Sequence, residues 1–227
     1  MGATLSQAET MARINPDWRE EETAWAQGLV AVGIDEVGRG PLAGPLLAAA
    51  VAVPPHFEAP WLELVRDSKQ LSARQRERLA GEVQASVLAW GTGEATVEEI
   101  DRWGMSEALM CAIRRAIAVL PAAPRLILLD GRPLPLLGQP HRAIIDGDAH
   151  CYSIAMASVI AKVARDRTMR ELDELFPGYG LGQHKGYATQ THREALARLG
   201  PSPVHRRSFI TVRRVLDGFV GQPRLIE

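Results

Sequence analysis

The chain has 227 residues, of which 46% are hydrophobic and 23% are charged. These fractions are close to the average for folded domains, and they exclude a mostly disordered chain, which would be poor in apolar residues and strongly charged. The formal net charge is -1, from 26 basic and 27 acidic side chains, so the overall balance gives no sign of a polyanionic partner. We expect one domain, with at most a small appendage.

The cysteines and the apolar runs indicate the compartment. Cys111 and Cys151 form no CxxC pair, which favours a reducing interior. The acidic N-terminal residues lack the apolar core of a signal peptide. The longest apolar run, 46–55, is about half as long as a membrane span. We therefore expect a soluble, cytoplasmic protein with no membrane partner, and a monomer.

The first half of the chain predicts two neighbouring strands, followed by helices and a third strand. Residues 1–27 are polar and acidic, and we interpret them as an N-terminal extension with a short helix at 17–26. Apolar runs at 29–34 and 46–53, separated by glycine and proline, are typical of buried strands. The other elements expected here are a helix over 72–88 with Ser72 as its N-cap, a strand over 89–96, and helices over 97–103 and 106–120.

The second half predicts two short strands and a long helix. The strands are expected at 126–129 and 143–145, each running into acidic residues and glycine. Apolar residues recur at helical spacing over 152–175, and Pro177 stops that helix. A shorter helix is expected at 189–199. Together these elements predict an α/β fold with a mixed sheet flanked by helices.

Charge is distributed unevenly along the chain. Residues 176–214 contain seven lysines and arginines against one acid, and three histidines lie in the same stretch, namely His184, His192 and His205. Residues 1–27 contain five acids against two arginines. This asymmetry favours a phosphate-rich partner that binds at one end. A solvated basic face is the alternative interpretation.

Acidic residues follow three of the predicted strands. Asp35 and Glu36 follow the first, Asp130 follows 126–129, and Asp148 lies just after 143–145. Because strand neighbours point to opposite faces, one of Asp35 and Glu36 should face the packed side, where a carboxylate needs a partner or a metal ion. Three or four carboxylates at one point suit Mg²⁺ or Mn²⁺ and not Zn²⁺. Two such ions roughly 4 Å apart serve in-line displacement at phosphorus.

Each of these residues also has a purely structural interpretation. Asp35 and Asp130 can cap turns, and Asp148 can cap the long helix. Asp166 can pair with its arginine neighbours. The segment 38–40, Gly-Arg-Gly, does not match GxGxxG, so it is either a tight turn or a place where the backbone approaches a ligand and Arg39 meets a phosphate.

Several separate segments together resemble one family. In chain order they are 33–45, 67–72, 129–131, 147–148, 158–166, 179–180, 184–187 and 205–209. The set is similar to bacterial ribonuclease HII, the type 2 ribonuclease H, over about residues 28–214. The resemblance covers neither the extension nor the tail at 215–227.

The resemblance implies a ribonuclease-H-like fold, with a catalytic domain over 28–214 and a small helical C-terminal part at about 176–214. It implies an endonuclease that hydrolyses the RNA strand of RNA/DNA hybrids and cuts 5′ to single ribonucleotides in duplex DNA. The products would carry a 3′-hydroxyl and a 5′-phosphate, and the cofactor would be a pair of Mn²⁺ or Mg²⁺ ions. The implied partners are RNA/DNA hybrid and ribonucleotide-containing DNA, and no replication or repair partner is identified.

The family's functional residues fall on definite positions of this chain. The implied catalytic and metal-binding residues are Asp35, Glu36, Asp130 and Asp148. The implied substrate-binding residues are Gly38, Arg39, Gly40 and Tyr187 at the ribose, with Lys69, Lys185, Arg206 and Arg207 at phosphates. The 2′-hydroxyl is what distinguishes RNA from DNA at one nucleotide, and small glycines let the backbone approach it.

Some positions depart from the family pattern, and two rival functions remain. Gln70 stands where the family often has lysine, and Asp146 stands where a lysine is expected. Lys162 and Arg165 are interpreted as charges that balance the acid cluster and lower its repulsion when metal is absent. A DNA-cutting nuclease of the same fold would need no ribose sensor, and a binding protein without catalysis would gain nothing from acids that repel a polyanion.

Overall fold

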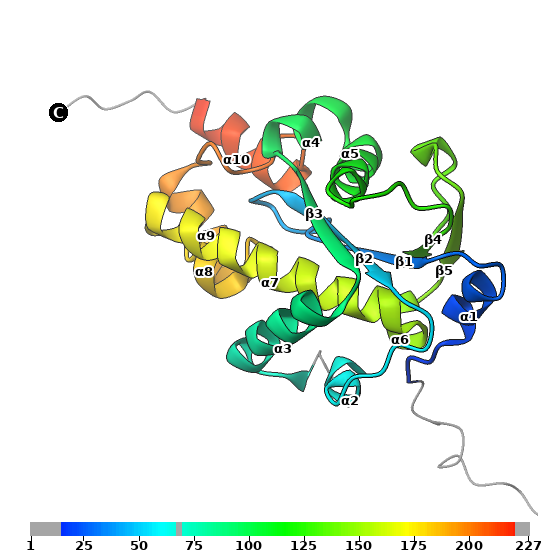
Figure 1. The fold of residues 1–227 in the computed structure, drawn as a ribbon. Helices are drawn as coiled ribbons and strands as arrows, with labels where there is room; N and C mark the ends of the chain where they lie inside the picture. Colours follow the sequence, from blue (N-terminus) through cyan, green and yellow to red (C-terminus); the bar gives the residue numbers. More distant parts are fainter. Residues whose placement is uncertain (1–14, 67–69, 221–227) are drawn as a thin grey trace, which may run out of the picture.

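A mixed five-stranded sheet forms the centre of the protein in the computed structural model, which describes residues 15–66 and 70–220 (Figure 1). The strand order is β3-β2-β1-β4-β5. The inner strand β1 pairs antiparallel with β2 and parallel with β4. The bounds are β1 (Ala31–Val37), β2 (Leu46–Val53), β3 (Ala89–Ala95), β4 (Ile127–Asp130) and β5 (His141–Ile144).

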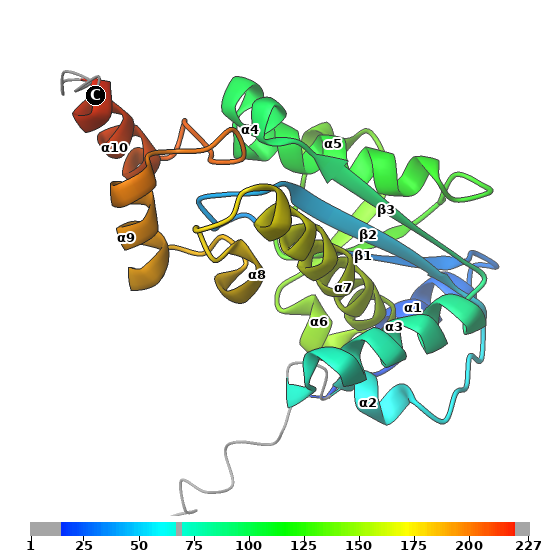
Figure 2. The ribbon, with the colours of Figure 1, turned by 90° about the vertical axis from the view of Figure 1, so that its left-hand side faces the viewer.

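Helices cover both faces of this sheet. The helices α4 and α5 lie on one face, and α7 lies on the other with α2 and α3 outside it (Figure 2). The bounds are α1 (Arg19–Trp25), α2 (Leu62–Arg66), α3 (Ala73–Ser86), α4 (Val97–Trp103), α5 (Met105–Ala118), α6 (Gly147–His150), α7 (Tyr152–Leu175), α8 (Leu181–His184), α9 (Gln190–Leu199) and α10 (Ile210–Val220), with a 3-10 turn at Pro135–Leu137. The predicted α/β architecture is confirmed.

The prediction of individual elements succeeds where apolar runs are bounded by proline or glycine. The bounds of β2, α4 and α7 agree with the predicted ranges, and Ser72 caps α3 in a capping box with Gln75. The short helices α2, α6 and α8 are not predicted, and neither is α10. Because α10 runs from Ile210 to Val220, it crosses the boundary expected at residue 214.

The long helix α7 approaches β1 closely because Gly33 has no side chain. A Cβ atom at Gly33 would lie 2.2 Å from the carbonyl carbon of Ser153. The buried face of α7 also contains small residues such as Ala157 and Ala161. This close packing places the middle of α7 beside the end of β1, where two of the predicted site acids lie.

The described part of the N-terminal region is fastened to the start of α7. Glu21 is fully buried, and its Oε1 atom accepts hydrogen bonds from the Ser153 N–H at 2.7 Å and from the Cys151 thiol at 3.1 Å. No side chain of α7 itself caps this end. Burial raises the pKa of Glu21, while the Ser153 N–H lowers it. An acid from α1 therefore caps a helix that begins far along the chain.

Replacing Glu21 with alanine should destabilise the protein by about 2 kcal/mol, because the Ser153 N–H then has no acceptor. For a chain of this size the expected fall in Tm is about 4–8 °C. The control is Glu22→Ala on the exposed side of the same helix, which should leave Tm nearly unchanged. Thermal melts that coincide for the two variants would contradict the capping role.

Candidate active site

The pairing of β1 with β4 brings two distant acids to the same end of the sheet. In this parallel pair Ile34 lies opposite Leu129, so the next residues along the two strands are Asp35 and Asp130. Strand β1 extends to Val37, and the two acids of β1 therefore lie inside the strand and not after it as predicted. The carboxyl ends of two parallel strands thus deliver two carboxylates to one edge.

Three carboxylates form a compact group at this edge. Oxygen atoms of Asp35, Glu36 and Asp130 lie within 4.8 Å of one another. Asp35 is only 7% exposed and is in contact with Ser158 of α7, whereas Glu36 and Asp130 are partly buried. The strand alternation therefore places one acid of the adjacent pair on the packed side, as expected.

Burial and mutual repulsion make these carboxylates difficult to ionise together. Burial, with the charges of Asp130 and Glu36, raises the pKa of Asp35 to about 8, against the lowering effect of the Ser158 hydroxyl and the Glu36 N–H. Burial also raises the pKa of Glu36, although Arg39 at 3.2 Å opposes this. Such a group favours either a proton or a bound cation.

Asp130 is held by the loop that leads into α6. Its Oδ1 atom accepts the N–H of Gly147 at 2.7 Å. Burial raises the pKa of Asp130, and the charges of Asp148 and Asp146 raise it further. Asp148 is therefore close enough to act on Asp130, but it lies outside the group of three acids that the structure brings within 4.8 Å. Its role as a fourth ligand stays a prediction.

The loop between β1 and β2 is held by Arg206. This side chain is fully buried and donates to the carbonyl oxygens of Gly38 at 2.6 Å, Arg39 at 3.0 Å and Gly44 at 3.0 Å. The interpretation of Arg206 as a phosphate anchor is therefore wrong, because all three hydrogen-bonded nitrogens point into the protein. Gly38 itself is buried with φ at 101°, so its part is to shape the loop.

A second buried arginine holds the other side of the same loop. Arg165 of α7 donates to the carbonyls of Pro45 at 3.1 Å, Ala43 at 3.2 Å and Lys185 at 3.0 Å. It is fully buried, and burial lowers its pKa. The interpretation that Arg165 balances the acids is thus replaced by a positioning role. Lys162 pairs with Asp166 one turn further along the same helix.

Tyr187 lies against the exposed tip of this loop. A Cβ atom built on Gly40 would be 4.0 Å from Cε1 of the Tyr187 ring. The tyrosine is 45% exposed, and Arg39 and Gly40 are exposed beside it. The structure therefore brings the predicted glycine-arginine-glycine loop and the predicted tyrosine together on one accessible surface.

The remaining predicted phosphate contacts differ in exposure. Arg207 is exposed, and its backbone N–H donates to Asp101. Lys185 is partly buried and donates to the Gly182 carbonyl, and burial lowers its pKa. Lys69 lies outside the described residues.

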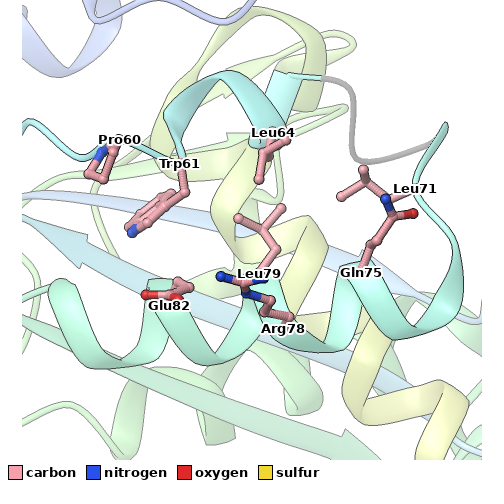
Figure 3. Close-up of a pocket in the computed structure, with 8 residues that line it drawn as sticks. All are labelled: Pro60, Trp61, Leu64, Leu71, Gln75, Arg78, Leu79 and Glu82. Atoms are coloured by element: carbon pink, nitrogen blue, oxygen red, sulfur yellow. The ribbon is translucent and has the colours of Figure 1, made fainter.

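A hollow of about 270 Å³ opens directly beside the acids. Its lining includes Glu36, Arg39, Asp130 and Arg132. A second hollow of about 370 Å³ lies between α2 and α3, and its lining includes Trp61, Leu64 and Leu79 (Figure 3). None of the three clustered acids lines that second hollow. The arginines at the first hollow suit a phosphate group, whereas its carboxylates repel one unless a cation neutralises them.

Sequence reasoning missed several groups that support this site. Ser158 lies within one of the segments that resemble the family, yet the sequence pattern assigns it no role; a polar residue among the apolar residues of α7 is the signal that could have found it. The N–H of Gly147 carries no sequence signal, because any residue type supplies one. Nothing in the adjacent pair Arg206 and Arg207 predicts which one is buried.

Comparison with known proteins gives the same fold and then the family. The structure is similar to the crystal structure of ribonuclease H2 from Pyrococcus horikoshii, with a TM-score of 0.69 and 26% identity over 86% of this chain and 100% of the other. The fold with its strand-end acids is thus that of a ribonuclease-H-like nuclease.

A family model described as ribonuclease HII matches residues 32–212. Curated proteins named ribonuclease HII are 50% identical in Nitrosococcus oceani, over 84% of this chain and 93% of the relative, and 43% identical in Dehalococcoides mccartyi, over 91% and 98%. The chain belongs to the ribonuclease HII family, and it is a ribonuclease H hydrolase. Within the described residues, every helix is too short or too polar to cross a bilayer.

Proposed function

We propose that this enzyme cuts the RNA strand of RNA/DNA hybrids and cleaves 5′ to single ribonucleotides in duplex DNA, leaving a 3′-hydroxyl and a 5′-phosphate. The observation that carries the proposal is that two features with different tasks are adjacent, since Arg39 at the loop tip pairs with Glu36 of the acid group at 3.2 Å. One is the acid group Asp35, Glu36 and Asp130, and the other is the loop tip with Tyr187 against Gly40. Acids alone suit any phosphodiester cleavage, whereas a sugar-facing tyrosine beside a glycine suits a ribose.

The donor set fits a divalent cation. Three carboxylates within 4.8 Å, one of them with a pKa of about 8, repel each other until a proton or a cation neutralises them. All of their ligand atoms are oxygens, which suit Mg²⁺ or Mn²⁺. We propose that Asp35, Glu36 and Asp130 hold a pair of such ions, with Asp148 as a further ligand. When bound, the ions supply Lewis-acid activation and charge stabilisation at the scissile phosphate.

The other residues bind and orient the substrate. Arg39 is exposed at the hollow beside the acids, where its guanidinium can contact a backbone phosphate. Tyr187 presents its ring to the sugar and its hydroxyl to the 2′-hydroxyl, while Arg207 and Lys185 contact phosphates and fix the register of the duplex. Arg165 and Arg206 act on the loop and not on the substrate.

The direct test compares three duplexes of one sequence: all DNA, DNA with one ribonucleotide, and RNA paired to DNA. With Mg²⁺ or Mn²⁺, we expect cleavage of the second and third and none of the first. The termini of the products should map the cut to the 5′ side of the ribonucleotide. Equal cleavage of the all-DNA duplex would assign the site to a DNA nuclease, and binding without cleavage would remove the catalytic role.

Tyr187→Phe should reduce cleavage at a single ribonucleotide by about tenfold, which corresponds to the loss of one hydrogen bond. Because Tyr187 is 45% exposed, Tm should not change. The matched control is Tyr152→Phe, at the start of α7, which should cleave like the wild type. The ratio of kcat/KM for the ribonucleotide-containing duplex between variants is the measurement. If Tyr187→Phe leaves kcat/KM for this duplex unchanged, Tyr187 is not part of the ribose site.

A further inference from the structure

Three histidines from the basic C-terminal quarter lie together behind Tyr187. The rings of His184 and His192 are stacked with centroids 4.3 Å apart, and Nε2 of His192 lies 3.1 Å from Nε2 of His205. His192 and His205 are fully buried. None of the three has been given a part in the proposed function, although all lie in one compact stretch of the sequence.

The hydrogen bonds of these rings determine where each proton lies. Nδ1 of His205 accepts the N–H of Ser202 at 3.1 Å and lies 2.8 Å from the Ser202 hydroxyl, which can also donate to it. A nitrogen that accepts a backbone N–H carries no proton, so the proton of the neutral ring is on Nε2. Nδ1 of His192 lies 2.9 Å from the Tyr187 carbonyl, which can only accept, so this nitrogen carries the proton and Nε2 is bare. The Nε2–H of His205 therefore donates to Nε2 of His192.

The result is a hydrogen-bond chain with one direction, from Ser202 through His205 and His192 to the carbonyl of Tyr187. A further proton on Nε2 of His192 would face the Nε2–H of His205. A further proton on Nδ1 of His205 would face the N–H of Ser202. Burial lowers the pKa of His192, and it lowers the pKa of His205 to about 4. The groups facing the pair are the His184 ring over His192 and the Tyr179 ring 4.8 Å from His205. His192 and His205 are therefore both neutral at neutral pH.

Histidines hold both backbone polar groups of Tyr187. Its N–H donates to the carbonyl of His184 at 3.0 Å, and its carbonyl accepts from Nδ1 of His192 at 2.9 Å and from the Thr189 N–H at 2.8 Å. The Tyr187 side chain is 45% exposed and packs against Gly40. Side-chain packing therefore restrains only one side of its ring. The backbone must then set where the ring stands.

We propose that His205 and His192 are positioning residues for ribose recognition, because their directed hydrogen-bond chain fixes the backbone of Tyr187 and so places its ring over Gly40. The proposal rests on the proposed function in one respect, namely that Tyr187 reads the ribose. The proton positions themselves do not depend on it.

The first test is ¹⁵N spectroscopy of the histidine rings in the full-length wild-type protein at neutral pH. A protonated and a bare imidazole nitrogen resonate at separate frequencies, so the tautomer of each ring can be read directly. We expect the Nδ1–H form for His192 and the Nε2–H form for His205. The opposite tautomer or a charged ring at either position would overturn the proposal.

The second test uses two replacements of His192 that each keep one ring nitrogen. The amide of His192→Asn occupies the place of Nδ1 and retains a donor to the Tyr187 carbonyl, whereas that of His192→Gln occupies the place of Nε2 and loses it. We expect the glutamine variant to lower kcat/KM for the one-ribonucleotide duplex by about tenfold, and the asparagine variant by about twofold or less. Equal effects in the two folded variants would overturn the positioning role.

Repeating both replacements in a Tyr187→Phe background separates the two proposals. If the histidines act through Tyr187, the difference between the glutamine and asparagine variants should shrink there, because the hydroxyl that they place is gone. An undiminished difference would overturn the coupling. If Tyr187→Phe alone has no effect while the tautomers are as assigned, the ribose-reading role of Tyr187 fails and the hydrogen-bond chain stands.

Discussion

Asp35→Asn should abolish turnover and at the same time raise the Tm of the metal-free protein. The carboxylate is the most buried of the three acids and is in contact with both Asp130 and Ser158 through charge and hydrogen bonding. Loss of a cation ligand removes several kcal/mol of transition-state stabilisation, so kcat should fall by roughly a thousandfold or more. The amide keeps the shape of the side chain and removes its charge.

The stabilising effect has a definite pH dependence. The pKa of Asp35 is about 8 in the fold and 3.8 in an ordinary environment, so between these pH values the folded state holds one proton more than the unfolded state. Metal-free wild type therefore loses stability as pH rises through this range, and Asp35→Asn does not share that loss. The gap in Tm should be small near pH 4 and largest above pH 8, by several degrees at about 2–4 °C per kcal/mol.

The measurement is a series of thermal melts with a chelator from pH 4 to pH 9, beside cleavage assays with Mg²⁺ and Mn²⁺. The control is Asp217→Asn, which makes the same chemical change at an exposed position of α10 and should alter neither activity nor the pH dependence of Tm. A variant at Asp35 that cleaves normally, or that melts below wild type at pH 8, would contradict the assignment of this acid.

Arg206→Met should lower Tm strongly, whereas Arg207→Met should not, although the two residues are adjacent. The first removes the donors to three carbonyls of the loop between β1 and β2, at a cost of about 3 kcal/mol or more. The expected fall in Tm is about 6–12 °C, and cleavage should fall sharply because the loop loses its conformation. The second removes an exposed charge and should leave Tm unchanged.

Binding at several salt concentrations separates the two arginines. Arg207→Met should weaken binding to a duplex whatever its sequence, and it should reduce the slope of log K against log salt by about 1. The folded fraction of Arg206→Met should keep the wild-type slope, because its charge does not face the substrate. If Arg206→Met melts like wild type while its salt slope falls, the residue is a phosphate contact after all.

The sequence predicts the strands and long helices well because their ends are chemically marked. Pro177 stops α7, and Ser72 begins α3 with a complete capping box. The sequence underestimates β1, because Asp35 and Glu36 look like residues that follow a strand when periodicity alone is considered. In the folded protein, pairing with β2 and β4 keeps these two acids within β1, although their local sequence is typical of the end of a strand.

The site is predictable to the extent that motifs mark it. Three of the four proposed ligands converge, while the distance of Asp148 from the others depends on the short helix α6, which no periodicity announces. The hydrogen bonds from Arg165 and Arg206 to the loop between β1 and β2 are not predictable from one sequence. An arginine that binds carbonyls cannot be distinguished there from one that binds phosphates. The burial of Arg165 and Arg206 is decided by contacts more than 120 residues apart.

The loop between β1 and β2 is made early in synthesis, yet its carbonyls take their donors from residues made much later. During synthesis on the ribosome, this loop therefore cannot form all of its final hydrogen bonds until residue 206 has been made. A fragment trimmed to the sheet and its covering helices would retain every acid but display them beside an unsupported turn. The C-terminal quarter is thus a scaffold for the first hairpin, and a miniaturised version of this enzyme has to keep it.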